Sequence, residues 1–250
     1  MLRGKIVLLV AGIVAVGLVA GQAGAAKPQS STAAPAKMTT LLPNVGMVGS
    51  TSTTVTRVFS TATNEINCGF MEGWWSTNTA SSDCNSNYET GVSESGVVVH
   101  GYSTFYLSGW PNPCGILSAY LSVNSGKGNQ AGYGQGDGTQ SLGLFDVATD
   151  PWTLSEKDNN PNSTIYSDLG SGSMYGGPYT VSTYDNNVTE QLFLNQTGLN
   201  GLLAARNQGY FSIGMGLINP TAGNYQFLFG FTGAHPITLT VTQPRLCKVS

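Results

Sequence analysis

The sequence ILSAYLSVN at residues 116–124 decides the fold class of this chain. Its apolar side chains recur at every second position, at Leu117, Ala119, Leu121 and Val123. Because successive side chains of a strand point to opposite faces, this alternation predicts a strand with one buried face and one solvated face. A strand of this kind needs a second layer of structure to cover its apolar face.

Segments with the same two-residue period recur along most of the chain, separated by clusters of Gly, Asn, Asp and Pro. The other predicted strands are 54–60, 97–107, 141–148, 179–184, 188–195, 210–218, 225–231 and 237–242. The last one places Ile237, Leu239 and Val241 on its inward face. Together these segments predict an all-β fold, a two-sheet antiparallel β-sandwich.

One segment departs from the β pattern. Residues 197–208 carry Leu199, Leu202, Leu203 and Arg206 at helical spacing, and Gly209 follows where a helix would end. We therefore expect one short helix, within a single sandwich domain that spans residues 53–250.

The amino-terminal residues have the organisation of an export signal. A short basic lead, MLRGK, precedes an apolar run at residues 6–20 and small residues at 22–26, which predicts a signal peptide at 1–26. Because the apolar run is short for a membrane span, we expect cleavage, a secreted protein and no transmembrane segment afterwards. Residues 27–52, rich in Ser, Thr, Ala and Pro, are predicted to be a flexible tether.

The low content of charged residues indicates which classes of partner the protein can bind. Only 9% of residues are charged and the formal net charge is −3, so the polar surface is built mainly from neutral side chains. Nucleic acid is excluded as a partner because its recognition needs a clustered basic face.

Four cysteines, Cys68, Cys84, Cys114 and Cys247, predict two disulfides in an exported protein. Three pairings are open, and we favour Cys68 with Cys84 and Cys114 with Cys247. Zinc is disfavoured because no Cys-x-x-Cys spacing occurs.

Four pieces of the chain carry a family resemblance. They are ILSAYLSV, SLGLFDVATDPWTL, IYSDLGSGSMYGGPYTVS and VTEQLFLNQTGLNGLLAARNQGYFSIGMGL. With this pattern, about half of the chain resembles a jelly-roll-like domain of uncharacterised exported bacterial surface proteins of the PEP-CTERM type. The resemblance implies a jelly-roll-like sandwich at the cell exterior and implies no activity. The chain lacks the hydrophobic sorting tail of those proteins, so we expect release or non-covalent attachment.

Signatures of catalysis are sparse. The chain contains no Gly-x-Ser-x-Gly elbow and no His-Glu-x-x-His helix, and we expect His100 and His235 to be surface or hydrogen-bonded histidines. Paired carboxylates, Glu65 with Glu72 or Glu89 with Glu94, leave a secreted glycan-cleaving enzyme as an alternative. We lean towards a protein that is not an enzyme.

No cofactor is predicted, with calcium as the alternative. Asp146 and Asp150 flank one predicted loop, with Asp137 and Asp158 nearby in sequence, and carboxylates of this kind are calcium ligands. The competing interpretation is that Asp146 and Asp150 cap turns.

Aromatic residues give the sharpest functional hint. Trp74, Trp75, Tyr88 and Trp110 lie in loop-like sequence, where rigid flat rings could stack on sugar rings. The competing interpretation places one tryptophan of the Trp74–Trp75 pair in the core. The leading hypothesis is a non-catalytic protein that binds a polysaccharide, a surface glycan or another extracellular component. A structural matrix or coat subunit that associates through a strand edge is the main alternative.

Overall fold

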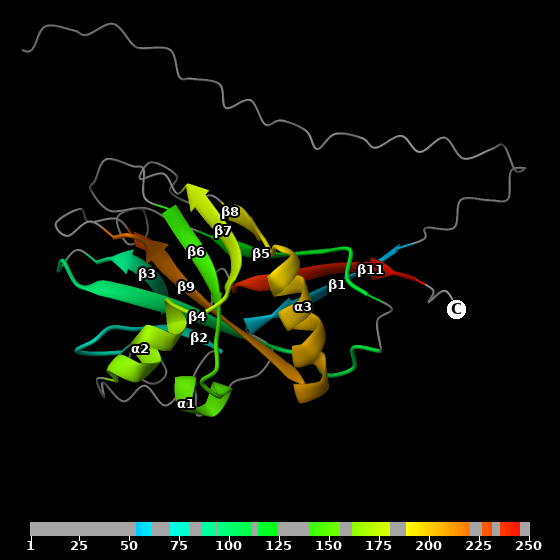
Figure 1. The fold of residues 1–250 in the computed structure, drawn as a ribbon, viewed down its shortest axis with the longest axis horizontal. Helices are drawn as coiled ribbons and strands as arrows, with labels where there is room; N and C mark the ends of the chain where they lie inside the picture. Colours follow the sequence, from blue (N-terminus) through cyan, green and yellow to red (C-terminus); the bar gives the residue numbers. More distant parts are fainter. Residues whose placement is uncertain are drawn as a thin grey trace, which may run out of the picture. The chain divides into compact units, whose positions relative to one another are not determined.

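The strands of this chain form two antiparallel sheets that pack against each other (Figure 1). The computed structural model describes residues 54–61, 71–80, 87–93, 95–111, 115–124, 141–155, 162–180, 189–220, 227–231 and 236–245. The smaller sheet has the order β1 (Thr54–Ser60), β11 (Thr238–Pro244), β5 (Ser118–Asn124), β8 (Thr189–Phe193). The two-sheet β-sandwich predicted from the alternation is confirmed.

The larger sheet follows the order β10 (Phe227–Phe231), β3 (Asn87–Val92), β4 (Val98–Tyr106), β9 (Tyr210–Ile218), β6 (Ser141–Asp146), β7 (Met174–Thr180). A further strand, β2 (Glu72–Trp75), pairs with β4 beside β3. Predicted strands 54–60 and 210–218 match β1 and β9 at both ends.

The main core lies between the two sheets. The smaller sheet contributes Ala119, Leu121, Val123, Leu239 and Val241, all at most 1% exposed, as their alternation predicts. The larger sheet contributes Phe105, Leu142, Leu144, Ile213 and Met215. Leu117 departs from the prediction: it precedes β5 and is 56% exposed, because the buried part of the segment begins at Ala119.

Strand β9 explains how a helix can cover the outer face of the larger sheet. Its large side chains, such as Ile213 and Met215, enter the main core, and its small residues Gly214 and Gly216 face the other way. A Cβ atom on Gly214 would lie 2.2 Å from the carbonyl oxygen of Leu169, in α2 (Ser163–Leu169). The glycine therefore permits close packing of α2 on the sheet.

A second cluster of buried residues lies beneath α2 and α1 (Pro151–Ser155). It consists of Trp75, Ala80, Tyr102, Leu154, Ile165 and Leu169. These two short helices were not predicted, because the stretch from 151 to 169 has too few apolar residues to show a helical period. None of the described helices is both long and apolar enough to cross a membrane.

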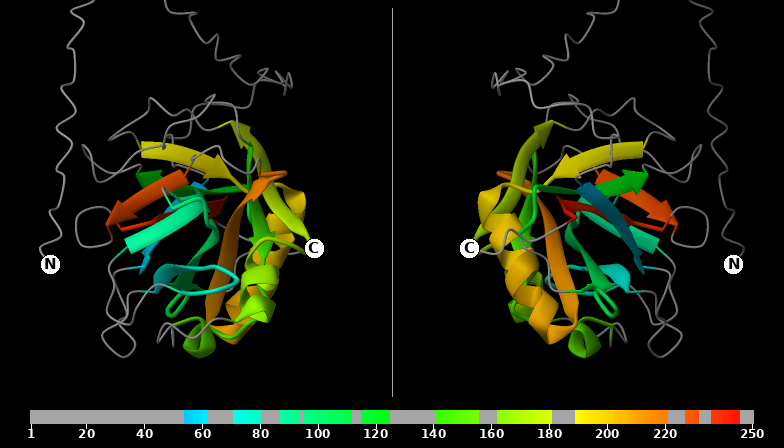
Figure 2. Two further views of the ribbon diagram at one scale, coloured as in Figure 1. Left: turned by 90° about the vertical axis from the view of Figure 1, so that its left-hand side faces the viewer. Right: turned by 90° about the vertical axis from the view of Figure 1, so that its right-hand side faces the viewer.

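The predicted helix at 197–208 is confirmed as α3 (Gln196–Ala205), followed by a 3-10 turn at Arg206–Gln208. Gly209 ends it in the left-handed conformation with φ 84°. Leu202 is buried in the main core, and Figure 2 shows α3 beside β9.

Two parts of the strand prediction were wrong. β2 and β3 lie in sequence interpreted as loop, because residues on both of their faces are buried and no alternation shows. β7 covers Met174–Thr180, whereas the predicted strand began at Tyr179. The predicted signal peptide, tether and all four cysteines lie outside the described residues.

Candidate functional site

An open pocket of about 590 Å³ lies between β1 and the segment that follows β4. We call it the β1 pocket, and its lining residues are Thr56, Arg57, Val58, Phe59, Ser60, Tyr106, Ser108 and Trp110. Its volume falls within the range of small-molecule binding sites, roughly 300–1,000 Å³.

The pocket runs along the outer edge of β1. Five consecutive residues of this strand line it, whereas a pocket on one face of a strand would touch only alternate residues. β1 pairs with β11 and stands at the end of its sheet. The N–H of Thr61 donates to the carbonyl of Ile237, next to β11. Along an antiparallel strand, every second residue directs its backbone N–H and C=O towards the paired strand. Counting back from Thr61, the backbone groups of Thr56 and Val58 point away from β11, towards the outer edge.

Arg57 stands on the inward side of this edge strand. Val55, Arg57 and Phe59 are half-buried, whereas Thr56 and Val58 are exposed. The Nε–H group of Arg57 is buried and has no hydrogen-bond partner among the described residues.

A tight turn after β4 places Trp110 at the pocket. The N–H of Trp110 donates to the carbonyl of Leu107 at 3.1 Å, which closes a four-residue turn. Gly109, the third residue, has φ 72°, a value that favours glycine and is typical of a type II turn. The turn folds the chain back so that the indole packs beside β1.

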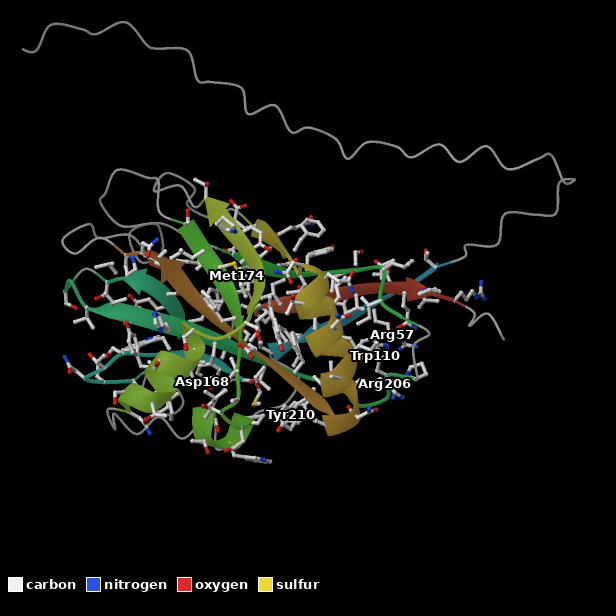
Figure 3. All side chains as sticks on the ribbon, viewed as in Figure 1. Arg57, Trp110, Asp168, Met174, Arg206 and Tyr210 are labelled. Atoms are coloured by element: carbon white, nitrogen blue, oxygen red, sulfur yellow. The ribbon has the colours of Figure 1, made fainter. Side chains whose placement is uncertain are left out.

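Three contacts from different elements fix Trp110, which Figure 3 shows next to Arg206. Its ring lies 5.6 Å from that of Phe59, centroid to centroid, at a tilt of 56°. Its Nε1–H donates to Oε1 of Gln243 at 2.5 Å, and its carbonyl accepts from Nε of Arg206 at 3.2 Å. The rigid ring therefore forms one wall of the pocket, although only 4% of the residue is exposed.

The polar character of the β1 pocket comes from hydroxyls and one cation. Thr56, Ser60, Ser108 and Tyr106 supply hydroxyl groups, and Arg57 is the only charged residue among the described residues of the lining. Burial raises the pKa of the Tyr106 phenol, so that hydroxyl remains a hydrogen-bond donor at neutral pH. The pocket thus combines aromatic surface, hydroxyl groups and a positive charge.

The four predicted aromatic ligands lie in different parts of the structure. Trp75 is buried in the second cluster, and Tyr88 is buried in the main core, where its hydroxyl donates to the carbonyl of Asn124. Trp74 is half-buried on β2. The physical reason is that these residues sit on strands, whose alternation directs neighbouring side chains to opposite faces. Trp110 alone lines the pocket.

One member of each predicted carboxylate pair lies within the described residues. Glu72 is fully buried on β2, where its Oε2 accepts from the hydroxyl of Thr61 at 2.5 Å and from the N–H of Ile237 at 3.3 Å. Glu89 is half-buried on β3. Glu65 and Glu94 lie outside the described residues. Glu72 therefore ties β2 to the segment that precedes β11.

Asp146 and Asp150, the predicted calcium ligands, both accept hydrogen bonds from turn backbone. Asp146 accepts from the N–H of Ser173 at 2.6 Å. Asp150 accepts from the N–H groups of Trp152 and Thr153 and from the Thr153 hydroxyl, and these bonds, the hydroxyl first, lower its pKa. Within the described part of the chain, no three His, Cys, Asp or Glu side chains gather around a common point that could hold a metal.

Sequence reasoning did not single out Arg57, Phe59 or Tyr106. A usable signal was present, because TVTRVFS at residues 54–60 alternates and places the arginine on the face shared by Val55 and Phe59. A charge at an inward position of a strand is unusual enough to mark a site.

Comparison with known proteins adds no family: no protein-family model matches the chain, and no curated protein matches it significantly.

Proposed function

We propose that this chain is a secreted, non-catalytic β-sandwich protein that holds a glycan in the β1 pocket. The carrying observation is the composition of that pocket, which sets Trp110 and Tyr106 beside hydroxyl groups and Arg57. The basic lead and apolar run at residues 1–26 support export.

The physical case rests on how sugars are recognised. A sugar ring presents apolar C–H groups, which pack on an aromatic ring, and hydroxyl groups, which need hydrogen-bond partners. Trp110 is held by Phe59, Gln243 and Arg206, so a ligand that contacts it costs little side-chain entropy. Preformed pockets with a few polar groups are the usual form of small-ligand sites.

A structural matrix subunit is the second candidate, and one observation favours it. β1 offers an outer edge, and Val58 on it is 63% exposed, so a second strand could pair there. The inward-facing Arg57 opposes this use, because inward charges on edge strands are a common protection against edge-to-edge pairing.

Binding can be tested by fluorescence, because Trp110 is the only tryptophan in the pocket lining. Trp152 is 58% exposed on α1, so the mature protein carrying Trp152→Phe removes a solvent-exposed signal. We expect a saturable change of emission with one class of soluble polysaccharide, and protection of the remaining emission from acrylamide quenching.

A pocket-filling variant supplies the control. Ser108→Phe adds bulk at an exposed turn residue that lines the pocket, and Ser95→Phe makes the same change at an exposed turn residue outside the lining. Binding should be lost in Ser108→Phe and kept in Ser95→Phe. Equal binding by both variants would place the ligand elsewhere and sink the proposal.

A further inference from the structure

The charge of the β1 pocket is opposite in sign to that of the chain. The protein has a formal net charge of −3, yet the described residues that line the pocket include Arg57 and no carboxylate. A cation in a partly enclosed site of a negatively charged molecule raises the local concentration of anions relative to the rest of the surface.

The other described cations lie on the same side of the fold. Arg206 donates to the carbonyl of Trp110, one wall of the pocket, and Figure 3 shows it with Arg57 and Trp110 in one region. Arg245 follows Pro244, which pairs with Thr54 at the start of β1. The described part of the chain contains no lysine, so these arginines are all of its Lys and Arg residues. Positive charge is thus gathered near β1.

Arg57 also has unused hydrogen-bonding capacity. Its Nε–H group has no partner in the described residues and is itself buried, so a ligand in the pocket pairs with the guanidinium through its terminal nitrogens. Arginine presents its donors in a planar fork that matches two oxygens of an oxyanion. Charge-assisted hydrogen bonds of this kind are stronger than hydrogen bonds between neutral groups.

We infer that the ligand of the β1 pocket is an acidic glycan whose single-charged oxyanion, a uronate carboxylate or a sulfate ester, pairs with Arg57 while a sugar ring contacts Trp110. This inference rests on the proposed function and adds the substrate class. Arg57 has no carboxylate beside it among the described lining residues, and one arginine matches one negative charge, so a polymer with one acid group on each sugar is the expected partner. An acidic peptide shares the charge but lacks the ring that the aromatic wall and hydroxyls would recognise.

The test uses short oligosaccharides, because long polymers bind through many sites at once. Calorimetry on the mature protein compares galacturonate tetramers with the same tetramers after methyl esterification, which removes the charge and keeps the rings. Sulfated and unmodified glucose tetramers form the second pair and distinguish sulfate from carboxylate. A tetraglutamate peptide tests the peptide alternative.

We expect one acidic tetramer to bind roughly 10- to 100-fold more tightly than its neutral counterpart, the value of about one to two charge-assisted hydrogen bonds. Arg57→Gln should abolish this preference, and Arg57→Lys, which keeps the charge and loses the fork, should retain part of it. Arg245→Gln is the matched control, since it removes one positive charge outside the pocket lining and should leave the preference intact.

The outcomes separate the two proposals. Equal, saturable binding of charged and neutral tetramers that Ser108→Phe abolishes would overturn the acidic preference and leave the glycan pocket standing. Absence of binding by all four tetramers would overturn both. Tetraglutamate that binds as tightly as the acidic sugars, and loses affinity in Arg57→Gln, would overturn the assignment to a glycan.

Discussion

His100 is buried on β4, on the face of the larger sheet that α2 covers. Its ring stacks on Tyr166, with centroids 4.1 Å apart, and its Nδ1 lies 2.7 Å from the carbonyl oxygen of the same residue. Because a carbonyl only accepts, Nδ1 carries the proton of the neutral ring. The expected hydrogen-bonded histidine is confirmed here, and His235 lies outside the described residues.

The burial of His100 predicts loss of stability in mild acid. Desolvation lowers its pKa below the ordinary 6.5, an effect that the hydrogen bond to Tyr166 only partly offsets. The unfolded chain therefore takes up a proton near pH 6.5 while the folded chain resists it, so the free energy of unfolding falls as the pH drops below that value. Urea denaturation between pH 7.5 and 5 measures the effect.

Two variants isolate the contribution of His100 to that pH dependence. His100→Phe removes the titrating group from a site that already stacks an aromatic ring, and its stability should fall less steeply over the same pH range. Tyr166→Phe keeps the stacked ring and the backbone acceptor and should leave the slope unchanged. An unchanged slope in His100→Phe would show that another group governs the acid response.

Gly214 is a second residue that is constrained by the packing of α2. A Cβ there would meet backbone atoms of Leu169, which cannot rotate away, so Gly214→Ala should lower the free energy of unfolding by about 1–3 kcal/mol. Gly209→Asn is the control, because a Cβ meets nothing there and asparagine tolerates the left-handed conformation. Comparable losses in the two variants would contradict this account of helix packing.

At the scale of elements, helix α3 is joined to the larger sheet through its N-cap residue. Asn195 precedes α3, and its Oδ1 accepts from the N–H of Gly198 at 2.9 Å. Its Nδ2 donates to the carbonyl of Met174 at 2.8 Å, at the start of β7. One side chain therefore starts the helix and connects it to a strand.

This double role predicts a graded loss of stability. Asn195→Ala removes the cap and the strand contact and should cost about 2 kcal/mol, whereas Asn195→Asp keeps the cap acceptor and should cost less. Asn162→Ala removes only a cap, that of α2, and should cost about 1 kcal/mol. Thermal unfolding of the three variants gives this order, and a smaller loss in Asn195→Ala than in Asn162→Ala would refute it.

Elements whose apolar residues recur at a regular spacing were predictable from the sequence, and strands buried on both faces were not. β1, β9 and α3 followed from alternation or helical spacing in the sequence. β2 holds the buried Glu72 beside Trp75, so no polar face marks it as a strand. Because β2 shows no alternation, its sequence was interpreted as an aromatic loop, and the burial of Trp75 in the second cluster was not foreseen.

The candidate site is formed by residues that lie far apart in the sequence. The β1 pocket joins residues 56–60 to residues 106–110, and Gln243 and Arg206 hold its wall from two further elements. Pairing of β1 with β11 and the turn after β4 bring these segments together, and neither long-range fact can be read from local pattern. Only Trp110 was singled out from the sequence, and for a different set of partners.

The outer edge of β1 predicts whether the protein associates with itself at high concentration. With Arg57 facing inward from β1, we expect the mature protein to remain monomeric in sedimentation velocity runs up to millimolar concentration. Arg57→Val leaves an edge strand with apolar residues at 55, 57, 58 and 59, which should promote association. Concentration-dependent association of the unaltered protein would instead favour the matrix-subunit candidate.

The second cluster gives the molecule a part that can open by itself. Six buried residues make up this cluster, against nineteen in the main core, and helices of five and seven residues cover it. Short helices on a small apolar base need little free energy to detach, so local opening precedes global unfolding. Amide protons of α2 should therefore exchange with deuterated solvent well before those of β9, and the surface beneath α2 becomes transiently accessible while the β1 pocket stays intact.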